Sequence, residues 1–360
     1  SIGKANLLAK PARMMRWLFV LLMFVTAAAN AQTISATTYP LTTGTGATLE
    51  DMSSGTTDIV AANVDDGGGN GLMNIGFDYW FVGTRYTTFG ASANGFVRLG
   101  GTIPGTDWTN AMATSTFSPI IAPYWDDLWT GTNGKVHYKT IGTAPNRKLV
   151  VEWLNMQVPR VGSGASGAGT FQLWLSETSG KIEMVYGSGM ITNSANSGYS
   201  VGLANSSTVF GSVTTNGGTI SYATANNAQT DAITSGTKYT FTPISSMAAA
   251  SGLTFSSVGL TSMQLNWTAA SPTTGIVRYA IYGSTDGGVT FQYYGQTANA
   301  TATSLAVSGL TANTSYVWRV YSVSEGALGS SYPEESQATN ACSLAGGTYS
   351  VGPTGTYASL

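Results

Sequence analysis

The feature that most constrains this sequence is its repeated alternation of short strand-like runs with turn residues, without helical periodicity. Runs rich in Val, Ile, Tyr, Phe, Trp and Thr recur between clusters of Gly, Asn, Ser and Thr. This pattern is typical of sandwiches and barrels, so we expect an all-β fold. In the first part of the chain it predicts strands at 77–81, 95–99, 136–140, 148–154, 170–175, 181–186 and 199–203, with residues 177–180 as a hairpin connection.

The N-terminal segment predicts a secretory signal peptide. Lys10, Arg13 and Arg16 precede an apolar run at 17–29, which ends in small residues. This arrangement predicts cleavage after Ala31, with translation starting at Met14 or Met15 and read-through before it. No later run approaches the roughly 20 apolar residues of a membrane-spanning helix. We therefore expect export, to the medium or the cell surface, and no membrane span.

The charge of the exported part argues against nucleic acid as a partner. Four of the 15 basic residues and none of the 17 acidic ones lie in residues 1–31, so the remainder carries a net charge of −6. Such a balance gives no electrostatic grip on phosphate backbones or anionic lipids.

The single Cys and single His exclude several kinds of chemistry. Structural zinc needs about four Cys or His ligands, and a Ser-His or Cys-His nucleophile needs a well-placed His. His137 lies in an alternating run and is predicted to be an ordinary strand residue. Cys342 has no partner cysteine in this sequence, which predicts a partner elsewhere.

The length exceeds one ordinary domain, and a small-residue stretch marks the division. We expect a signal peptide at 1–31, a first sandwich at 32–244, a linker at 245–250, a second sandwich at 251–340, and the truncated start of a further module at 341–360. The tail resembles the opening of a repeat such as a parallel β-helix, so the chain is expected to be a fragment of something longer.

Five separated pieces of the first module carry a family resemblance. They are Ser92-Ala-Asn-Gly-Phe96 after Phe77, Ile121-Ala-Pro-Tyr-Trp-Asp-Asp-Leu128, residues 142–147 leading into Val150-Val-Glu-Trp153, Phe171-Gln-Leu-Trp-Leu-Ser-Glu177, and Ile182-Glu-Met-Val-Tyr186. Their order and spacing resemble a nidogen-like β-sandwich module of large secreted bacterial surface proteins. The resemblance covers about residues 75–205 and implies extracellular attachment or assembly, with no catalytic residues to carry over. Residues 32–74 match no pattern that we can name.

The second module resembles a fibronectin type III domain over its whole length. Leu265-Asn-Trp267 matches the second strand with its core Trp, and Arg278-Tyr-Ala-Ile-Tyr-Gly283 matches the third. The run from Leu305 to Ser322 places Tyr316 at the family's corner tyrosine, which bonds back to the backbone. Together the two modules predict tandem β-sandwiches, the first a larger jelly-roll or nidogen-like sandwich and the second Ig-like.

Two acidic pairs are candidate calcium ligands. Asp126 and Asp127 end an apolar run between two tryptophans, and Asp65 and Asp66 precede three glycines. Adjacent side chains of a strand point to opposite faces, and Asp at a strand end commonly accepts hydrogen bonds from turn amides. Structural capping is therefore the favoured interpretation. Calcium, which takes six to eight oxygens, is the alternative, and it is the one cofactor that the sequence suggests.

A second candidate site lies on the outer face of the first sandwich. Strand alternation puts Gln172 and Trp174 opposite the core residues of their strand. If the neighbouring strands pair, Glu152 and Glu183 join them. An indole ringed by hydrogen-bonding groups is suited to a sugar or a peptide. The alternative is a purely structural role, in which Trp174 packs under a loop, since large aromatic side chains are mostly buried. A glycosidase pair formed by Glu152 and Glu183 is the least favoured interpretation.

These observations favour a non-catalytic, exported modular protein that serves cell-surface adhesion or binds an extracellular glycan or surface protein. The alternative is an accessory region of a secreted carbohydrate-active enzyme, whose catalytic β-helix would lie beyond residue 360. The oligomeric state is not predicted.

Overall fold

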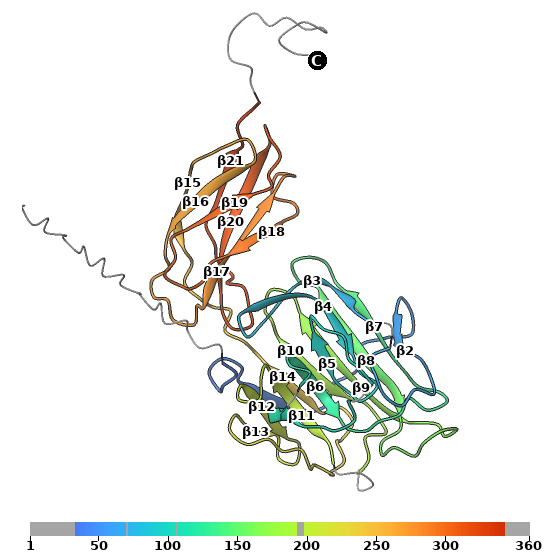
Figure 1. Cartoon of the computed structure of the whole chain (residues 1–360). Coiled ribbons are helices and arrows are strands. Elements are labelled where there is room, and N and C mark those ends of the chain that lie inside the picture. Colours follow the sequence, from blue (N-terminus) through green and yellow to red (C-terminus); the bar gives the residue numbers. More distant parts are fainter. Residues whose placement is uncertain (1–32, 70, 106, 115, 193–197, 343–360) are drawn as a thin grey trace, which may run out of the picture.

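The computed structural model describes residues 33–342, apart from 70, 106, 115 and 193–197, and shows two β-sandwiches joined end to end (Figure 1). Within these residues one 3-10 turn, η1 (Met112–Thr114), is the only element that is not a strand. The expected all-β tandem is thus confirmed. The predicted signal peptide lies outside the described residues, as does the tail after Cys342, whose own side chain is exposed.

The first sandwich consists of two seven-stranded sheets. One sheet contains, in spatial order, β1 (Leu41–Gly44), β14 (Lys238–Phe241), β10 (Ile182–Tyr186), β9 (Gly169–Ser176), β8 (Lys148–Met156), β7 (Lys135–Ile141) and β2 (Thr57–Val60). The other contains β13 (Thr219–Ser221), β12 (Phe210–Thr214), β11 (Ser200–Ala204), β6 (Ile120–Trp125), β5 (Val97–Leu99), β4 (Thr84–Ala91) and β3 (Met73–Phe81).

Strand alternation fills the space between these sheets. Phe171, Leu173 and Leu175 of β9 are fully buried in the main core, as a period of two requires. Trp153 of β8 stacks on Phe171, with ring centroids 5.1 Å apart. The predicted hairpin at 177–180 joins β9 to β10 and includes Gly180 at a φ of +62°, a conformation that glycine adopts without strain.

The connection between β1 and β2, residues 45–56, crosses the outer face of the first sheet. It joins β1 and β2, which lie at opposite edges of that sheet, and Leu49 and Met52 pack on Trp174 along the way. Six inter-strand spacings amount to about 29 Å, and twelve residues can span about 40 Å when extended. We call residues 45–56 the crossing segment. No pattern in residues 32–74 predicted this course of the chain.

The second sandwich pairs a three-stranded sheet with a four-stranded one. The first contains β15 (Ser251–Ser256), β16 (Ser262–Thr268) and β19 (Ser304–Ser308); the second contains β18 (Gln292–Gln296), β17 (Arg278–Ser284), β20 (Ser315–Val323) and β21 (Glu334–Ala338). The Tyr316 hydroxyl accepts a hydrogen bond from the Thr311 amide at 2.9 Å, as expected of a corner tyrosine. Trp267 lies in the core.

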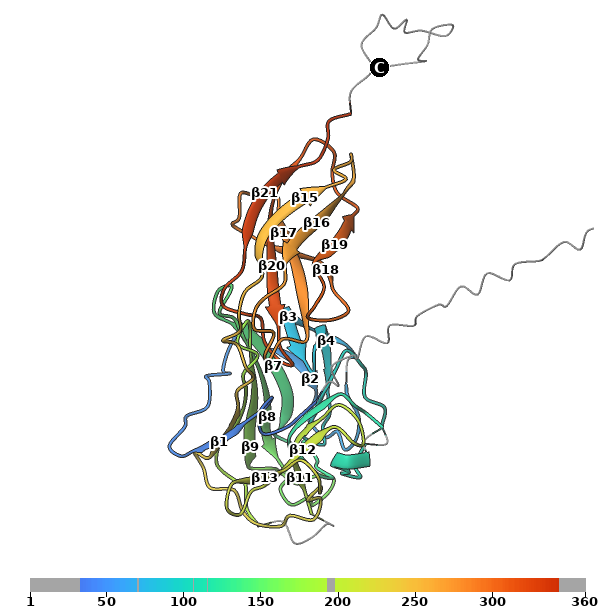
Figure 2. The ribbon, with the colours of Figure 1, turned by 90° about the vertical axis from the view of Figure 1, so that its left-hand side faces the viewer.

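The two sandwiches are in extensive contact where the β3–β4 turn meets the second module (Figure 2). Trp80 is 2% exposed and packs with Ala280, Tyr282 and Val323 of the second module. The Leu328 amide donates to the Thr178 carbonyl at 3.1 Å. The junction therefore combines an apolar contact with backbone hydrogen bonds from both modules.

The register of the strands fixes what lies at the other end of the first sandwich. From Thr84 at the junction, β4 runs away from the second module, β5 returns, and β6 runs away again. The loops that follow Trp125 and Met156, and the loop that precedes Met73, are therefore at the end farthest from the junction. We call this the distal end. No helix within the described residues is long and apolar enough to cross a membrane.

Candidate functional site

The four residues predicted to bind a ligand on the outer face do share one face, but that face is covered. Trp174 pairs with Val150 on one side and with Glu183 on the other, and Gln172 pairs with Glu152. The exposed fractions of these four residues, Glu152, Gln172, Trp174 and Glu183, are 5%, 0%, 8% and 9%. The expectation of an open aromatic platform is therefore corrected, and the alternative of Trp174 packed under a loop describes the structure.

The crossing segment supplies the cover. Met52 is buried with Trp174, and Leu49 packs against the same cluster. The Lys148 ammonium lies 4.2 Å from the Trp174 ring centroid and forms a 2.6 Å ion pair with Glu50. One face of the indole therefore meets a cation that the crossing segment holds in place.

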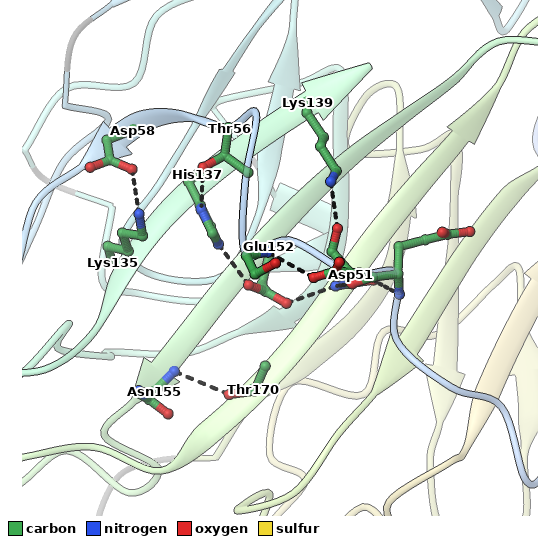
Figure 3. Close-up of polar contacts among 12 residues, drawn as sticks. Asp51, Thr56, Asp58, Lys135, His137, Lys139, Glu152, Asn155 and Thr170 are labelled. Carbon is green, nitrogen blue, oxygen red and sulfur yellow. Dashed lines mark hydrogen bonds and ion pairs between the residues drawn. The ribbon is translucent and has the colours of Figure 1, made fainter. Parts of the chain in front are cut away.

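A chain of polar contacts runs beneath the crossing segment (Figure 3). Gln172 accepts from the Glu50 amide at 2.9 Å and donates to the Glu50 carbonyl at 2.9 Å. The same side chain donates to Glu152 at 2.7 Å and accepts from the Trp174 indole at 2.7 Å. Gln172 thereby satisfies both backbone groups of Glu50, which explains how a polar amide is tolerated at zero exposure.

His137 continues this chain toward an arrangement that resembles a catalytic triad. Its Nε2 lies 2.6 Å from Glu152 Oε2, and its Nδ1 lies 3.1 Å from the Thr56 hydroxyl. A hydroxyl, an imidazole and a carboxylate in this order can activate a nucleophile. His137 is only 2% exposed, so a substrate has no access to the base, and the contacts fasten the crossing segment to β7 and β8.

Glu183, the other member of the predicted pair, has its own partner. Its carboxylate forms a 2.9 Å ion pair with Lys238 on β14. Glu152 is engaged by His137 and Gln172. Two acids held in separate ion pairs and hydrogen bonds under a covering segment do not form an acid and base flanking a cleft. Ligand binding by the covered face remains a prediction that requires the crossing segment to move.

The two acidic pairs predicted as separate calcium clusters converge at the distal end. Ligand oxygens of Asp65, Asp66 and Asp127 lie within 4.8 Å of one another. Arg160 lies among them: it forms an ion pair with Asp65 and another, at 2.6 Å, with Asp127. Burial raises the pKa of Asp65 above its ordinary value, more than the neighbouring guanidinium lowers it.

Asp126 lies apart from this cluster and has the capping role that the sequence favoured. It is 1% exposed, and its Oδ1 accepts from the Asp127 amide at 2.9 Å. The two neighbouring aspartates, in the bend that follows β6, thus have different partners: Asp126 accepts from the Asp127 amide, and Asp127 pairs with Arg160.

The fit of calcium to the remaining three carboxylates depends on Arg160. Calcium takes six to eight oxygens, whereas here a guanidinium already compensates two of the three acids. With Arg160 in this position, the three aspartates do not fit a calcium ion. Calcium binding at these aspartates, as the sequence suggested, therefore stays a prediction.

Trp108, which the sequence patterns did not point to, is an exposed aromatic residue on a loop that contacts the loop of Asp66. Its indole is 44% exposed. The preceding Asp107 is buried and accepts from the Gly67 amide at 3.2 Å, which ties the loop of Trp108 to the loop of Asp66. Burial raises the pKa of the Asp107 carboxyl. The sequence signal was present, because Asp107-Trp108 follows a Gly-rich turn, but long-range contacts were needed to place it.

The distal end therefore gathers carboxylates, a guanidinium and indoles from four loops. Asn94 donates to Asp66 at 2.9 Å, and the Arg160 guanidinium lies 5.2 Å from the centroid of the Trp129 ring. This is the chemistry of a polar recognition surface: hydrogen-bonding groups of both signs beside flat apolar rings.

The structure is that of a modular all-β protein of two sandwiches, the first with a buried outer face and an elaborated loop end. Residues 38–243 match the family model described as NIDO related, and residues 248–339 match the model of the fibronectin type III domain. Because the first match spans more than half of the chain, the chain belongs to the NIDO-related family and carries a fibronectin type III domain after it. Both are non-catalytic types of module.

Comparison with solved structures gives similarity to single domains. A structure titled "Myokine structure" is 20% identical, with a TM-score of 0.23, and the match covers 26% of this chain and 99% of that one. The fibronectin type III domain derived from human KIAA0970 protein is 12% identical, with a TM-score of 0.24, and covers 28% and 78%. That of human collagen XX is 23% identical, with a TM-score of 0.22, and covers 26% and 95%. No curated protein matches the chain.

Proposed function

We propose that this chain is an exported, non-catalytic binding protein whose distal loops contact an extracellular glycan in cell-surface adhesion. The observation that carries the proposal is the contrast between the two ends of the first sandwich. One end is buried against the second module. The other carries Asp66, Asp127 and Arg160, together with Trp108, which is 44% exposed on a loop that hydrogen-bonds to the loop of Asp66.

The chemistry of the distal end favours a sugar. Carboxylate and amide oxygens accept hydrogen bonds from hydroxyl groups, a guanidinium donates them, and an exposed indole offers a flat apolar surface. Sandwich modules suit such a role because the strands keep the scaffold rigid while the loops carry the contacts. An accessory region of a carbohydrate-active enzyme would use the same surface and would give the same result in the test below.

The test is a glycan array probed with purified residues 32–360, with Trp108→Ala, and with Ser262→Ala as a matched control on the second module. We expect wild type and control to bind the same glycans, and Trp108→Ala to lose at least about tenfold in affinity with its circular dichroism unchanged. Absence of binding by the wild type would contradict the glycan proposal, and retained adhesion to cells would then indicate a protein partner. Unchanged binding by Trp108→Ala would remove the distal end as the site.

A further inference from the structure

A cavity between the two modules contains polar groups that the proposed function does not use. Its volume is about 410 Å³. The first module contributes parts of β3 and β4 and the side chains of Arg147 and Glu177, and the second contributes Tyr282, Phe291 and Tyr293. A pocket of this size, with a few convergent polar groups beside aromatic rings, is the usual form of a small-molecule site. We call it the junction cavity.

Two ion pairs form the wall that the first module contributes. Arg147 donates from Nε and Nη2 to the two carboxylate oxygens of Glu177, at 2.8 and 2.6 Å, and from Nη1 to the Gly76 carbonyl at 2.6 Å. Arg85 donates from Nη2 to Asp78 Oδ1 at 2.6 Å. The bidentate pair fixes the orientation of Arg147, whereas Asp78 engages only one end of the Arg85 guanidinium.

The second module completes the surroundings of this second ion pair. The Tyr282 hydroxyl donates to Asp78 Oδ2 at 2.9 Å. Burial, and then the Asp78 charge, raises the pKa of Tyr282 well above its ordinary value, so the hydroxyl stays a donor. The Arg85 guanidinium carbon lies 4.2 Å from the centroid of the Tyr293 ring. Both oxygens of Asp78 are therefore engaged, and one face of the guanidinium lies against an aromatic ring.

Arg85 retains hydrogen-bond donors that have no acceptor. A guanidinium carries five N–H groups, and among the described residues Asp78 Oδ1 accepts from one end of it. The Arg85 Nε is buried without a partner in that part of the chain, although the side chain as a whole is 29% exposed. An unsatisfied buried N–H is costly. The unmet hydrogen-bonding capacity of the cavity is therefore of the donor kind, which favours a ligand that brings an anionic oxygen.

The other groups in the cavity narrow the choice of anion. Asp78 and Glu177 would repel a dianion such as phosphate more strongly than a single carboxylate, and a carboxylate matches the guanidinium fork. The exposed Gln292 offers an amide where the cavity meets solvent. Phe291 beside it is held by Arg319, whose guanidinium carbon lies 3.7 Å from the ring centroid. A fixed ring and an amide suit the carbons and hydroxyl groups of a sugar.

We propose that the junction cavity binds an acidic monosaccharide of the uronate class, with its carboxylate on Arg85 and its ring against Phe291. The two sides of the cavity belong to different modules, so the bound sugar bridges them and stabilises their relative orientation. This site is separate from the distal end and does not depend on glycan binding there.

The experiment titrates the protein used for the glycan array, residues 32–360, with sodium glucuronate and follows the arginine Nε–H resonances by nitrogen–proton NMR. Each resonance is assigned by its loss in Arg85→Gln or in Arg98→Gln. Sodium chloride at the same concentration controls for ionic strength. Glucose, acetate and inorganic phosphate are titrated in parallel as the neutral sugar, the carboxylate alone and the dianion.

We expect glucuronate to shift the Arg85 resonance with a dissociation constant on the order of 1 mM, as is usual for a ligand of this size. The resonance of Arg98, which donates to the Thr102 carbonyl and does not line the cavity, should not move. Glucose, acetate and phosphate should each bind at least about tenfold more weakly.

Two variants and a control separate the contributions to binding, measured by calorimetry. Arg85→Gln should weaken glucuronate binding by at least about tenfold, and Phe291→Ala should reduce it to the level of acetate. Arg98→Gln, the matched control, should leave it unchanged. If Arg85→Gln fails to fold, the titration of the wild type decides alone.

An Arg85 resonance that stays in place at about 10 mM glucuronate would overturn the proposal. Glucose or acetate binding as tightly as glucuronate, or phosphate binding more tightly, would overturn the assignment to an acidic sugar. Trp108→Ala should leave the Arg85 shift intact; its loss in that variant would place the binding at the distal end instead. Failure of the distal end to bind glycans would not change this titration, so the two proposals fail independently.

Discussion

The covered outer face and the distal end of the first module contain the same kinds of side chain, yet they differ in what they can do. Each has carboxylates, a basic group and a tryptophan: Glu152, Lys148 and Trp174 in one, and Asp127, Arg160 and Trp108 in the other. On the covered face the polar groups bond to the crossing segment, whereas at the distal end the indole is 44% exposed. Residue composition alone therefore does not distinguish a ligand-binding surface from a set of contacts that holds a covering segment in place.

The largest effect should distinguish the two tryptophans. Trp174→Ala removes an indole that is 8% exposed and leaves a cavity under the crossing segment, so we expect a loss of about 3–5 kcal/mol in the free energy of unfolding. Trp108→Ala should change it by no more than about 0.5 kcal/mol, as is usual for surface substitutions. Urea unfolding followed by circular dichroism measures both, and equal losses would contradict the contrast.

The pH dependence of the junction should be the next largest effect. Burial raises the folded-state pKa of Glu325 from 4.5 to about 7, so folding favours the protonated carboxyl. The stability that this group contributes is fully present below pH 4.5 and is lost as pH rises to 7, by on the order of 3 kcal/mol. Glu325→Gln should flatten this part of the profile, and a slope that survives the substitution would assign it to another group.

The buried and exposed acids should respond differently to loss of charge. Glu152→Ala removes a buried partner of both His137 and Gln172, and we expect it to cost about 2–3 kcal/mol because those polar groups are left unpaired. Asp127→Ala, at a partly exposed ion pair, should cost no more than about 1 kcal/mol. Thermal unfolding of the two variants in parallel tests this; a larger loss for Asp127→Ala would indicate that the distal cluster is structural.

The smallest expected effect concerns calcium at the distal end. In the wild type Arg160 occupies the space between Asp65 and Asp127, so millimolar calcium should leave the melting temperature unchanged. In Arg160→Gln the three aspartates are left uncompensated, and calcium should raise the melting temperature by a few degrees through binding to the folded state. A calcium-dependent rise in the wild type would instead establish the calcium site that the sequence suggested.

Local signals predicted much of the scaffold. The strands around Phe171 and Glu183 and the hairpin at Gly180 depend on alternation and turn chemistry within a few residues. The corner at Tyr316 was instead implied by the resemblance to the fibronectin type III family. The grouping of Trp174 with its neighbours also followed from a period of two, once adjacent strands were assumed to pair.

Two features were beyond the reach of such patterns, because both arise from contacts between distant residues. The crossing segment covers Trp174 because β1 and β2 lie at opposite edges of one sheet, a topology that no local periodicity contains. The meeting of Asp65 with Asp127, and of Thr33 with Glu325, joins residues that are far apart in the sequence. The sequence of an acidic pair therefore indicates which ligands it could bind, but not which distant residues lie beside it in the fold.

The central claim is that the crossing segment seals the predicted platform, which leaves the distal end as the binding surface. Hydrogen exchange of the Glu50 amide, which donates to Gln172, tests this claim most directly in the free protein. We predict protection comparable with that of the amides of β8 and β9. Exchange as fast as that of exposed loop amides would show that the covered face opens, and would return Trp174 and Glu152 to consideration as ligand-binding residues.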